Sequence, residues 1–164
     1  MRTLLLLALL ALGCRTPRDV LPNHELSQDL GREVATSGSI EQPVINRTNA
    51  ERKAAGLRPL IDSPQLAEAA RRHAADMARR DKLAHEVDGR TAADRVKVAG
   101  FEYRSVGENI AWNQPTPTAA VDDWMKSSGH RKNLLGKEFT HIGVGMAVNA
   151  KGEPYWVQVF GTPR

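Results

Sequence analysis

The C-terminal part of the chain carries a strand-like hydrophobic pattern, and this pattern most limits the folds that the chain can adopt. The run "HIGVGMAV" (141–148) alternates large apolar and small residues, and "PYWVQVFG" (154–161) alternates again. The turn sequence "NAKG" separates the two runs, so they predict a β-hairpin. Gly143 and Gly145 share one face of the first strand, where they leave room for a helix or another backbone to pack closely.

Helical patterns precede this hairpin. Two of them begin with a typical N-cap residue and a proline at the first helical position, Ser63-Pro64 and Thr116-Pro117. Gly56 and Gly129 are expected to end the first and the last helix. Helices first and strands last indicate a layered α+β fold. The segments with helical spacing are 40–56, 62–80, 88–100 and 116–128.

The first residues, "MRTLLLLALLALGC", predict that the protein is exported. Arg2 precedes nine apolar residues, Leu4 to Leu12, which are too few for a transmembrane helix of about 20 residues. A signal peptide fits this pattern. The small residue before Cys14 resembles a bacterial lipobox, in which the cysteine is lipidated; an ordinary secretory signal is the alternative. We expect residues 1–14 to be a lipoprotein signal peptide. The protein would then be anchored at the cell envelope, periplasmic or on the surface, or secreted if Cys14 is not lipidated.

Cys14 is the only cysteine, so the folded part contains no disulfide and depends on burial alone. Residues 15–38 contain scattered proline, serine and glycine and predict a flexible tether. Residues 39–164 are long enough for one hydrophobic core. The net charge of +4, from 23 Lys and Arg against 19 Asp and Glu, suits an anionic envelope surface but is too small to indicate nucleic-acid binding. No nucleic-acid-binding motif occurs either.

Seven short motifs occur in the order seen in the CAP superfamily, which comprises cysteine-rich secretory proteins, insect antigen 5 and plant pathogenesis-related proteins. They are "NAERKAAGLRPL", "HAADMA", "AH", "GENIAW", "WMKSSGHRKNLLG", "IGVGMAV" and "YWVQVFG". The resemblance covers about Ile40 to Gly161 and is closest to the bacterial secreted branch, which also has "W…S.GHR.N" and lacks the cysteines. It implies a three-layer α-β-α sandwich with a central antiparallel sheet between helical layers.

The resemblance also implies a cleft with two histidines and two acidic residues. By motif, His85 matches the first histidine, Glu108 of "GEN" the first glutamate and His130 of "GHR" the second histidine. The position of the second glutamate, three residues after a tryptophan, is Ser127 here, so the set of four is incomplete. The acidic residues that could substitute, if the fold brings them to the cleft, are Glu86, Asp122 and Asp123.

The stretch "SVGENIAW" (105–112) places a glutamate directly after a glycine and directly before an asparagine. We interpret it as a loop that carries Glu108 into the cleft. Asn109 is expected to fix this loop through hydrogen bonds to the backbone. Trp112, beside Glu108 in the sequence, could line the cleft.

Two imidazoles and a carboxylate can hold a zinc ion and leave one coordination position open. His85, Glu108 and His130 are separated by 23 and 22 residues, so no compact zinc motif is present, and Zn²⁺ is suggested by the resemblance rather than required by the spacing. The alternative is that these groups satisfy one another and nearby backbone atoms, because buried polar groups need partners. His73 lies on the apolar face of its helix and is expected to be a core histidine with an internal hydrogen bond.

We interpret the chain as an exported bacterial CAP-domain lipoprotein without enzymatic activity. Its cleft would bind lipid, cell-wall material or a partner protein, and could also hold a divalent metal ion. The competing interpretation is a zinc-dependent peptidase or another hydrolase outside the cytoplasm, in which Glu108 and His130 would be catalytic. A serine hydrolase is disfavoured because no G-x-S-x-G motif is present. The cleft residues are His85, Glu108, His130, Ser127 and Trp112.

Overall fold

The computed structural model describes residues 39–164, which form one compact unit. The predicted signal peptide, its Cys14 and the predicted tether all lie outside the described residues. No helix of the described part is long and apolar enough to cross a membrane.

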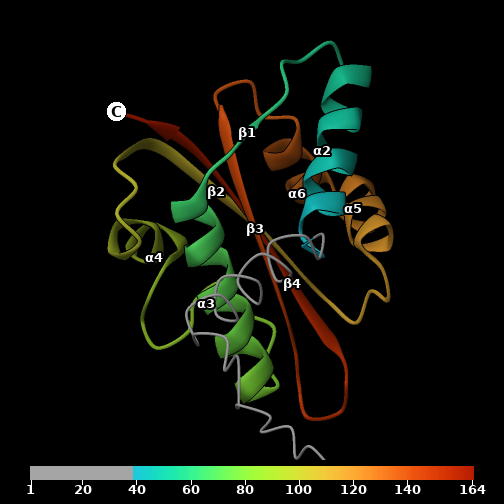
Figure 1. Ribbon diagram of the computed structural model, residues 1–164, viewed down its shortest axis with the longest axis vertical. Coiled ribbons are helices and arrows are strands. Elements are labelled where there is room, and N and C mark those ends of the chain that lie inside the picture. Colours follow the sequence, from blue (N-terminus) through green and yellow to red (C-terminus); the bar gives the residue numbers. More distant parts are fainter. Residues whose placement is uncertain (1–38) are drawn as a thin grey trace, which may run out of the picture. The chain divides into compact units, whose positions relative to one another are not determined.

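A sheet of four strands forms the centre of this unit (Figure 1). The strands are β1 (Ile61–Asp62), β2 (Tyr103–Trp112), β3 (His141–Val148) and β4 (Pro154–Pro163). They lie in the order β1-β3-β4-β2, so β2 is an edge strand. The predicted hairpin is confirmed, because β3 and β4 pair antiparallel from Val148 and Pro154 onward. The sheet is antiparallel through β3, β4 and β2, as expected, but the short β1 pairs parallel with β3 and makes it mixed.

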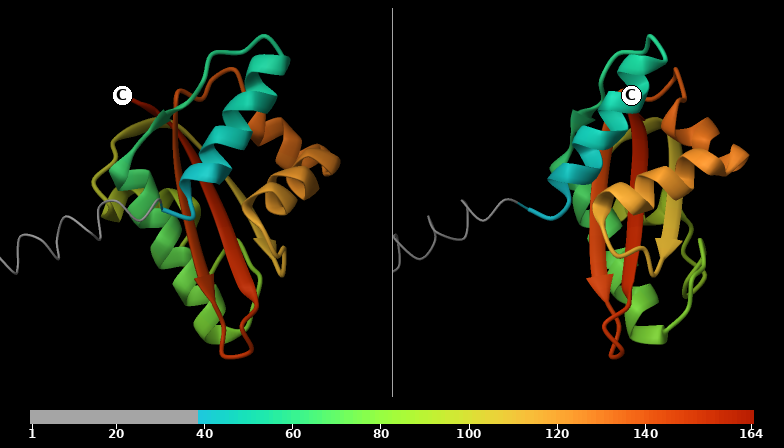
Figure 2. Two further views of the ribbon diagram at one scale, coloured as in Figure 1. Left: turned by 45° about the vertical axis from the view of Figure 1, so that its right-hand side comes forward. Right: turned by 90° about the vertical axis from the view of Figure 1, so that its right-hand side faces the viewer.

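Helices cover both faces of the sheet, which confirms the predicted α-β-α layers (Figure 2). Side chains alternate between the faces along β4: Val157 and Val159 join the core under one layer of helices, whereas Trp156 and Phe160 join the core under the other layer. The first layer contains α3 (Pro64–Arg80) and α4 (Ala92–Val98), and the second contains α2 (Gln42–Ala54), α5 (Pro117–Lys126) and α6 (Ser128–Leu134).

The helix starts follow the predicted caps. The Ser63 hydroxyl accepts a hydrogen bond from the Leu66 N–H at the start of α3, and Thr116 caps α5 in the same way. The predicted end of α5 was wrong. This helix ends at Lys126, Ser127 separates it from α6, and Gly129 lies within α6 instead of ending a helix.

The two glycines of β3 allow the close approach that their pattern predicts. A Cβ added at Gly143 would lie 2.1 Å from the backbone nitrogen of Ala67, and one added at Gly145 would lie 2.3 Å from the backbone nitrogen of Arg71. Both contacts are with the backbone of α3, so this helix rests directly on β3.

The stretch 105–112 is part of strand β2, so its interpretation as a loop was wrong. The apolar alternation typical of a strand is absent, because both faces of β2 carry a polar residue at its middle. Glu108 contacts side chains of the α3 and α4 layer, whereas Asn109 contacts α6. Neighbouring residues of a strand point to opposite faces. The pair Glu108-Asn109 therefore links the edge strand to both helical layers.

The glycine of the "GEN" motif, Gly107, is needed because a side chain at this position would clash. A Cβ at this position would lie 2.8 Å from the ring of Phe139. The glycine lets Phe139 pack against the edge strand immediately before Glu108.

Candidate functional site

Glu108 forms the centre of the candidate site. Its side chain is buried, with the residue 7% exposed. The carboxylate oxygen Oε1 lies 2.9 Å from Nδ1 of His85, in the segment 81–91 that joins α3 to α4. The other oxygen, Oε2, accepts a hydrogen bond of 2.7 Å from Nη2 of Arg95. Both oxygens are therefore engaged by the chain itself.

Arg95, on α4, connects three parts of the site. Besides Glu108, its guanidinium donates to the backbone carbonyl of His85 at 2.9 Å and to that of Arg90 at 2.7 Å. Its side chain is buried almost as completely as that of Glu108. The arginine holds the segment 81–91 against β2 and balances the charge of the buried carboxylate.

A second histidine, His73 of α3, lies beneath the carboxylate. Its Nε2 is 3.7 Å from Oε1 of Glu108, and its side chain is fully buried. The expected internal hydrogen bond is not formed with ordinary geometry at either ring nitrogen, but the backbone of Ala84 interacts with the ring and raises its pKa in part. Burial lowers the pKa of His73, and the charge of Glu108 opposes this effect only in part. His73 is therefore neutral at physiological pH.

The lowered pKa of His73 predicts a loss of stability in acid. An unfolded histidine takes up a proton near pH 6.5, whereas folded His73 resists it, so the free energy of unfolding falls as the pH drops below about 6.5. The maximum slope is about 1.4 kcal/mol per pH unit for one histidine. In His73→Leu this contribution disappears. Urea unfolding at about pH 7 and about pH 5 should show a smaller loss of stability in the variant than in the wild type, by up to about 2 kcal/mol. Equal losses in the two proteins would show that the pKa of His73 is not lowered in the folded domain.

The opposite face of β2 carries a network of amide side chains. Asn109 donates to the backbone carbonyl of His130 at 3.0 Å, and Asn133 of α6 donates to the backbone carbonyl of Glu108 and to the side-chain oxygen of Asn109, both at 3.0 Å. Asn109 also reaches the side chain of Gln158 on β4. These bonds fix α6, and with it His130, against the strand that carries Glu108.

The two imidazoles of the site differ in exposure. The His85 side chain is 59% exposed, whereas His130 is only partly so. Burial lowers the pKa of His130, and the charge of His85 lowers it further, so the two rings lie within electrostatic range of each other. Because Nδ1 of His85 contacts a carboxylate oxygen of Glu108, we place the proton of the neutral ring on Nδ1. The other nitrogen, Nε2, is then a hydrogen-bond acceptor on an exposed side chain.

The other predicted site residues lie further from this centre. Ser127 is half-buried at the junction of α5 and α6. Trp112 shares the face of β2 with Glu108 but lies at the end of the strand, where it is exposed and packs at a tilt against Tyr155. The acidic residues considered as substitutes do not reach the site: Glu86 is exposed, Asp122 pairs with Arg47, and Asp123 pairs with Lys126.

The donor set does not fit a metal ion in this geometry. Within residues 39–164, no group of three His, Cys, Asp or Glu side chains is placed to hold a metal. The guanidinium of Arg95 lies 2.7 Å from one oxygen of Glu108, where a cation would be repelled, and His85 contacts the other oxygen. Zinc binding by His85, Glu108 and His130 stays a prediction, and coordination by Glu108 itself would require its contacts with Arg95 and His85 to break.

Two residues of the site, Arg95 and His73, were not predicted. An arginine in a short, charged helix normally lies in solvent, so nothing in "DRVKV" singles out Arg95. His73 was found on the apolar face of its helix, but its proximity to Glu108 depends on how α3 crosses β2 and leaves no trace in the spacing.

The α-β-α sandwich, in which Glu108 of the edge strand contacts a histidine of the segment between α3 and α4, has the layout of an SCP-like domain. The model of the cysteine-rich secretory protein family, CAP, matches residues 45–160. The chain belongs to this family, as the resemblance of its motifs predicted.

Two curated relatives come from Bacillus subtilis (strain 168). The uncharacterized protein YkwD is 40% identical over 121 residues, which are 73% of this chain and 46% of that protein. The uncharacterized membrane protein YlbC is 33% identical over 129 residues, which are 78% of this chain and 37% of that protein. The chain therefore spans less than half the length of these relatives.

Solved structures show the same fold. An extracellular protein containing an SCP domain from Bacillus anthracis str. Ames superposes with a TM-score of 0.69 at 32% identity, over 74% of this chain and 40% of that one. An outer surface protein from Borrelia burgdorferi gives a TM-score of 0.69 at 19% identity, over 73% of this chain and 90% of that one. The second likeness shows the fold alone.

Proposed function

We propose that the protein is an exported, non-catalytic recognition domain that binds cell-wall material through His85 and His130. The observation that carries this proposal is the state of Glu108, whose two oxygens are engaged by Arg95 and His85 inside the domain. A carboxylate held in this way orients an imidazole instead of acting on a ligand.

Binding and catalysis differ in what they require of Glu108. A general base or metal ligand at Glu108 would have to give up Arg95, and leaving one partner of a buried ion pair uncompensated costs about 3–5 kcal/mol. The groups left to meet a ligand are the exposed Nε2 of His85 and the ring of His130. Neutral imidazoles pair with hydroxyl and amide groups. Glycan and peptide segments of a cell wall carry many such groups, whereas lipid chains carry few.

Export is part of the proposal. The similar Bacillus anthracis protein is described as extracellular, and the first 14 residues of this chain have the pattern of a signal peptide. A lipid anchor at Cys14 would hold the domain at the membrane surface, and a secreted form would result without it. A lipid ligand or a partner protein would be recognised by the same cleft and is an outcome of the test below.

Binding can be tested with the isolated domain, residues 39–164. We expect soluble glycan-peptide fragments of bacterial cell wall to shift the imidazole NMR signals of His85 and His130. We expect His85→Ala and His130→Ala each to weaken this binding about tenfold, the effect of one lost hydrogen bond of about 1.4 kcal/mol. His141→Ala is the matched control, because His141 lies on β3, which does not pair with β2. Cell-wall fragments that bind the wild type and all three variants equally, or that bind none of them, would refute the proposal. Lipid vesicles or a partner protein whose binding depends on His85 and His130 would show that the ligand belongs to that class instead.

The alternative, a hydrolase, is favoured by one observation. Glu108 orients an exposed imidazole, and such an imidazole can act as a general base. We expect the domain not to cleave a mixed peptide pool, with or without a chelator. Cleavage that is abolished by the chelator would identify the zinc-dependent peptidase, and cleavage abolished only by His85→Ala would identify a metal-independent hydrolase.

A further inference from the structure

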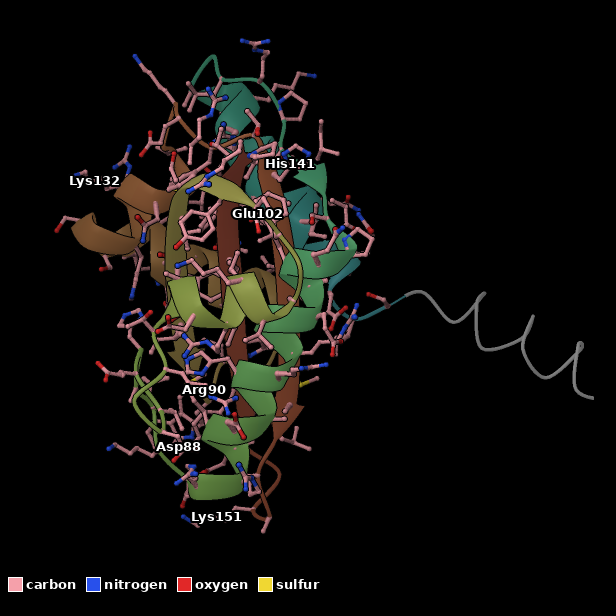
Figure 3. All side chains as sticks on the ribbon, turned by 90° about the vertical axis from the view of Figure 1, so that its left-hand side faces the viewer. Asp88, Arg90, Glu102, Lys132, His141 and Lys151 are labelled. Carbon is pink, nitrogen blue, oxygen red and sulfur yellow. The ribbon has the colours of Figure 1, made fainter. Side chains whose placement is uncertain are left out.

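Two adjoining hollows on the surface are lined by basic side chains. The first has a volume of about 630 Å³ and lies against the ends of α5 and α6 and the residues that follow α6. The second, of about 370 Å³, lies between the segments 56–61 and 137–140. Lys137 lines both hollows, and Figure 3 shows Lys132 projecting from α6 at the margin of the molecule. The exposed basic residues of the two linings are Arg58, Lys126, Arg131, Lys132 and Lys137.

Most of these exposed cations have no counter-charge. Lys126 pairs with Asp123 at 3.0 Å. The other four form no ion pair with any side chain of residues 39–164. Glu138 is the one acidic residue in the two linings. The hollows therefore carry a surplus of positive charge that the described part of the chain does not balance.

The dipole of α6 explains only part of this cluster. Arg131 and Lys132 lie in the last turn of α6, where cations are favourable. Lys137 and Arg58 lie outside the helices, on two segments far apart in the sequence. Like charges on one surface repel each other, so gathering them from separate segments costs free energy. An anionic ligand that spans both hollows would remove this cost.

The linings favour a flexible polyanion over a nucleic acid or a membrane. Their one aromatic residue, Phe139, is buried, whereas single-stranded nucleic acids stack their bases on exposed aromatic rings. Met125 and Leu135 of the first hollow are half-buried and pack against the core. Ile61 is the one large apolar residue of the linings that is strongly exposed. Binding to a bilayer scales with the apolar area inserted, which one side chain supplies only weakly.

We propose that the two hollows form one track that binds a linear polymer with repeated phosphate groups. Lysine and arginine donate charge-assisted hydrogen bonds to phosphate oxygens. Successive phosphates of one chain bind the cations of α6, then Lys137, then Arg58. Neither His85 nor His130 lines either hollow, so this inference goes beyond the function proposed for their cleft and does not depend on it.

The probe is short-chain linear polyphosphate, titrated by calorimetry into the isolated domain at several salt concentrations. Each phosphate contact releases counterions and contributes about −0.7 to the slope of log K against log salt, so the four unpaired cations predict a slope of about −3. Inorganic phosphate occupies one position of the track at a time and should bind at least about tenfold more weakly than the polymer.

The double variant Arg131→Gln and Lys132→Gln tests the assigned contacts. It should weaken polyphosphate binding about tenfold or more and reduce the slope to about −1.5. The thermal unfolding temperature should change little, because both side chains are exposed. The matched control, Lys82→Gln with Arg90→Gln, removes the same charge from exposed positions that line neither hollow, and it should bind polyphosphate as the wild type does.

Three results would overturn the proposal. Equal weakening in the two double variants would show that only the net charge of the domain matters. No binding of polyphosphate, or inorganic phosphate bound as tightly as the polymer, would rule out a track. Phosphatidylglycerol vesicles or a single-stranded oligonucleotide bound more tightly than polyphosphate, and lost in the first double variant, would assign the surface to a membrane or to a nucleic acid instead.

Discussion

Replacing Gly143 by valine should destabilise the domain by more than about 4 kcal/mol, which is at the extreme end for a single substitution. The new Cβ would lie 2.1 Å from backbone atoms of Ala67 and Leu66 on α3. Backbone atoms of a helix cannot move aside as the end of a side chain can, so α3 would have to separate from β3. Leu66 and Ala67 are both buried, and Leu66 belongs to the hydrophobic core between α3 and the sheet. A separation of α3 from β3 would therefore disrupt this core. Urea unfolding of the purified domain, or its failure to accumulate in soluble form, provides the measurement.

Gly129→Ala is the matched control for this prediction. Gly129 lies within α6, and a Cβ added there meets no atom within 4 Å. Alanine should stabilise the domain by about 0.5–1 kcal/mol, because glycine is the more flexible residue in a helix. If Gly143→Val were as stable as the wild type, the direct contact of α3 with β3 would be refuted.

Arg95→Met should cost about 3–5 kcal/mol, because it leaves the Glu108 carboxylate buried without its cation. The segment 81–91 would also lose the two carbonyl contacts that Arg95 makes at His85 and Arg90. We therefore expect a second, local effect: faster amide hydrogen exchange in this segment. Chemical denaturation of the variant measures the first effect, and exchange measurements in mild conditions measure the second.

A double variant separates the ion pair from other effects of the substitution. Arg95→Met combined with Glu108→Leu removes both charges and should recover at least about half of the lost stability, since apolar replacements of buried ion pairs are often well tolerated. If the two single losses simply add in the double variant, Arg95 and Glu108 do not stabilise each other, and the buried ion pair is refuted.

The parts of the fold that the sequence predicted are those controlled by local signals. Ser63 and Thr116 mark helix starts through their own hydrogen bonds to the next turn, and the alternation of β3 and β4 follows from their apolar faces. Strand β2 was missed because Glu108 and Asn109 interrupt the apolar alternation on both faces. Its polar residues are satisfied by groups far away in the sequence, at Arg95 and at Asn133.

The sequence also predicted only part of the candidate site. The motifs pointed to His85 and Glu108 together, and these two side chains lie within hydrogen-bonding distance. Arg95 escaped prediction because its burial depends on the docking of α4 over β2, a tertiary contact that no spacing records. For His73, the local pattern predicted burial correctly, but its approach to Glu108 depends on the packing of α3 against β2.

Calorimetric titration of Zn²⁺ into the isolated domain tests the central claim most directly, with His85→Ala and His130→Ala alongside. The claim is that Arg95 and His85 keep Glu108 engaged, so that the site presents imidazoles for recognition rather than a metal centre. It predicts no zinc binding that depends on both histidines. Zinc binding at micromolar concentration or tighter, abolished in each variant, would contradict the claim, because the two imidazoles would then hold a metal ion while Glu108 only orients His85.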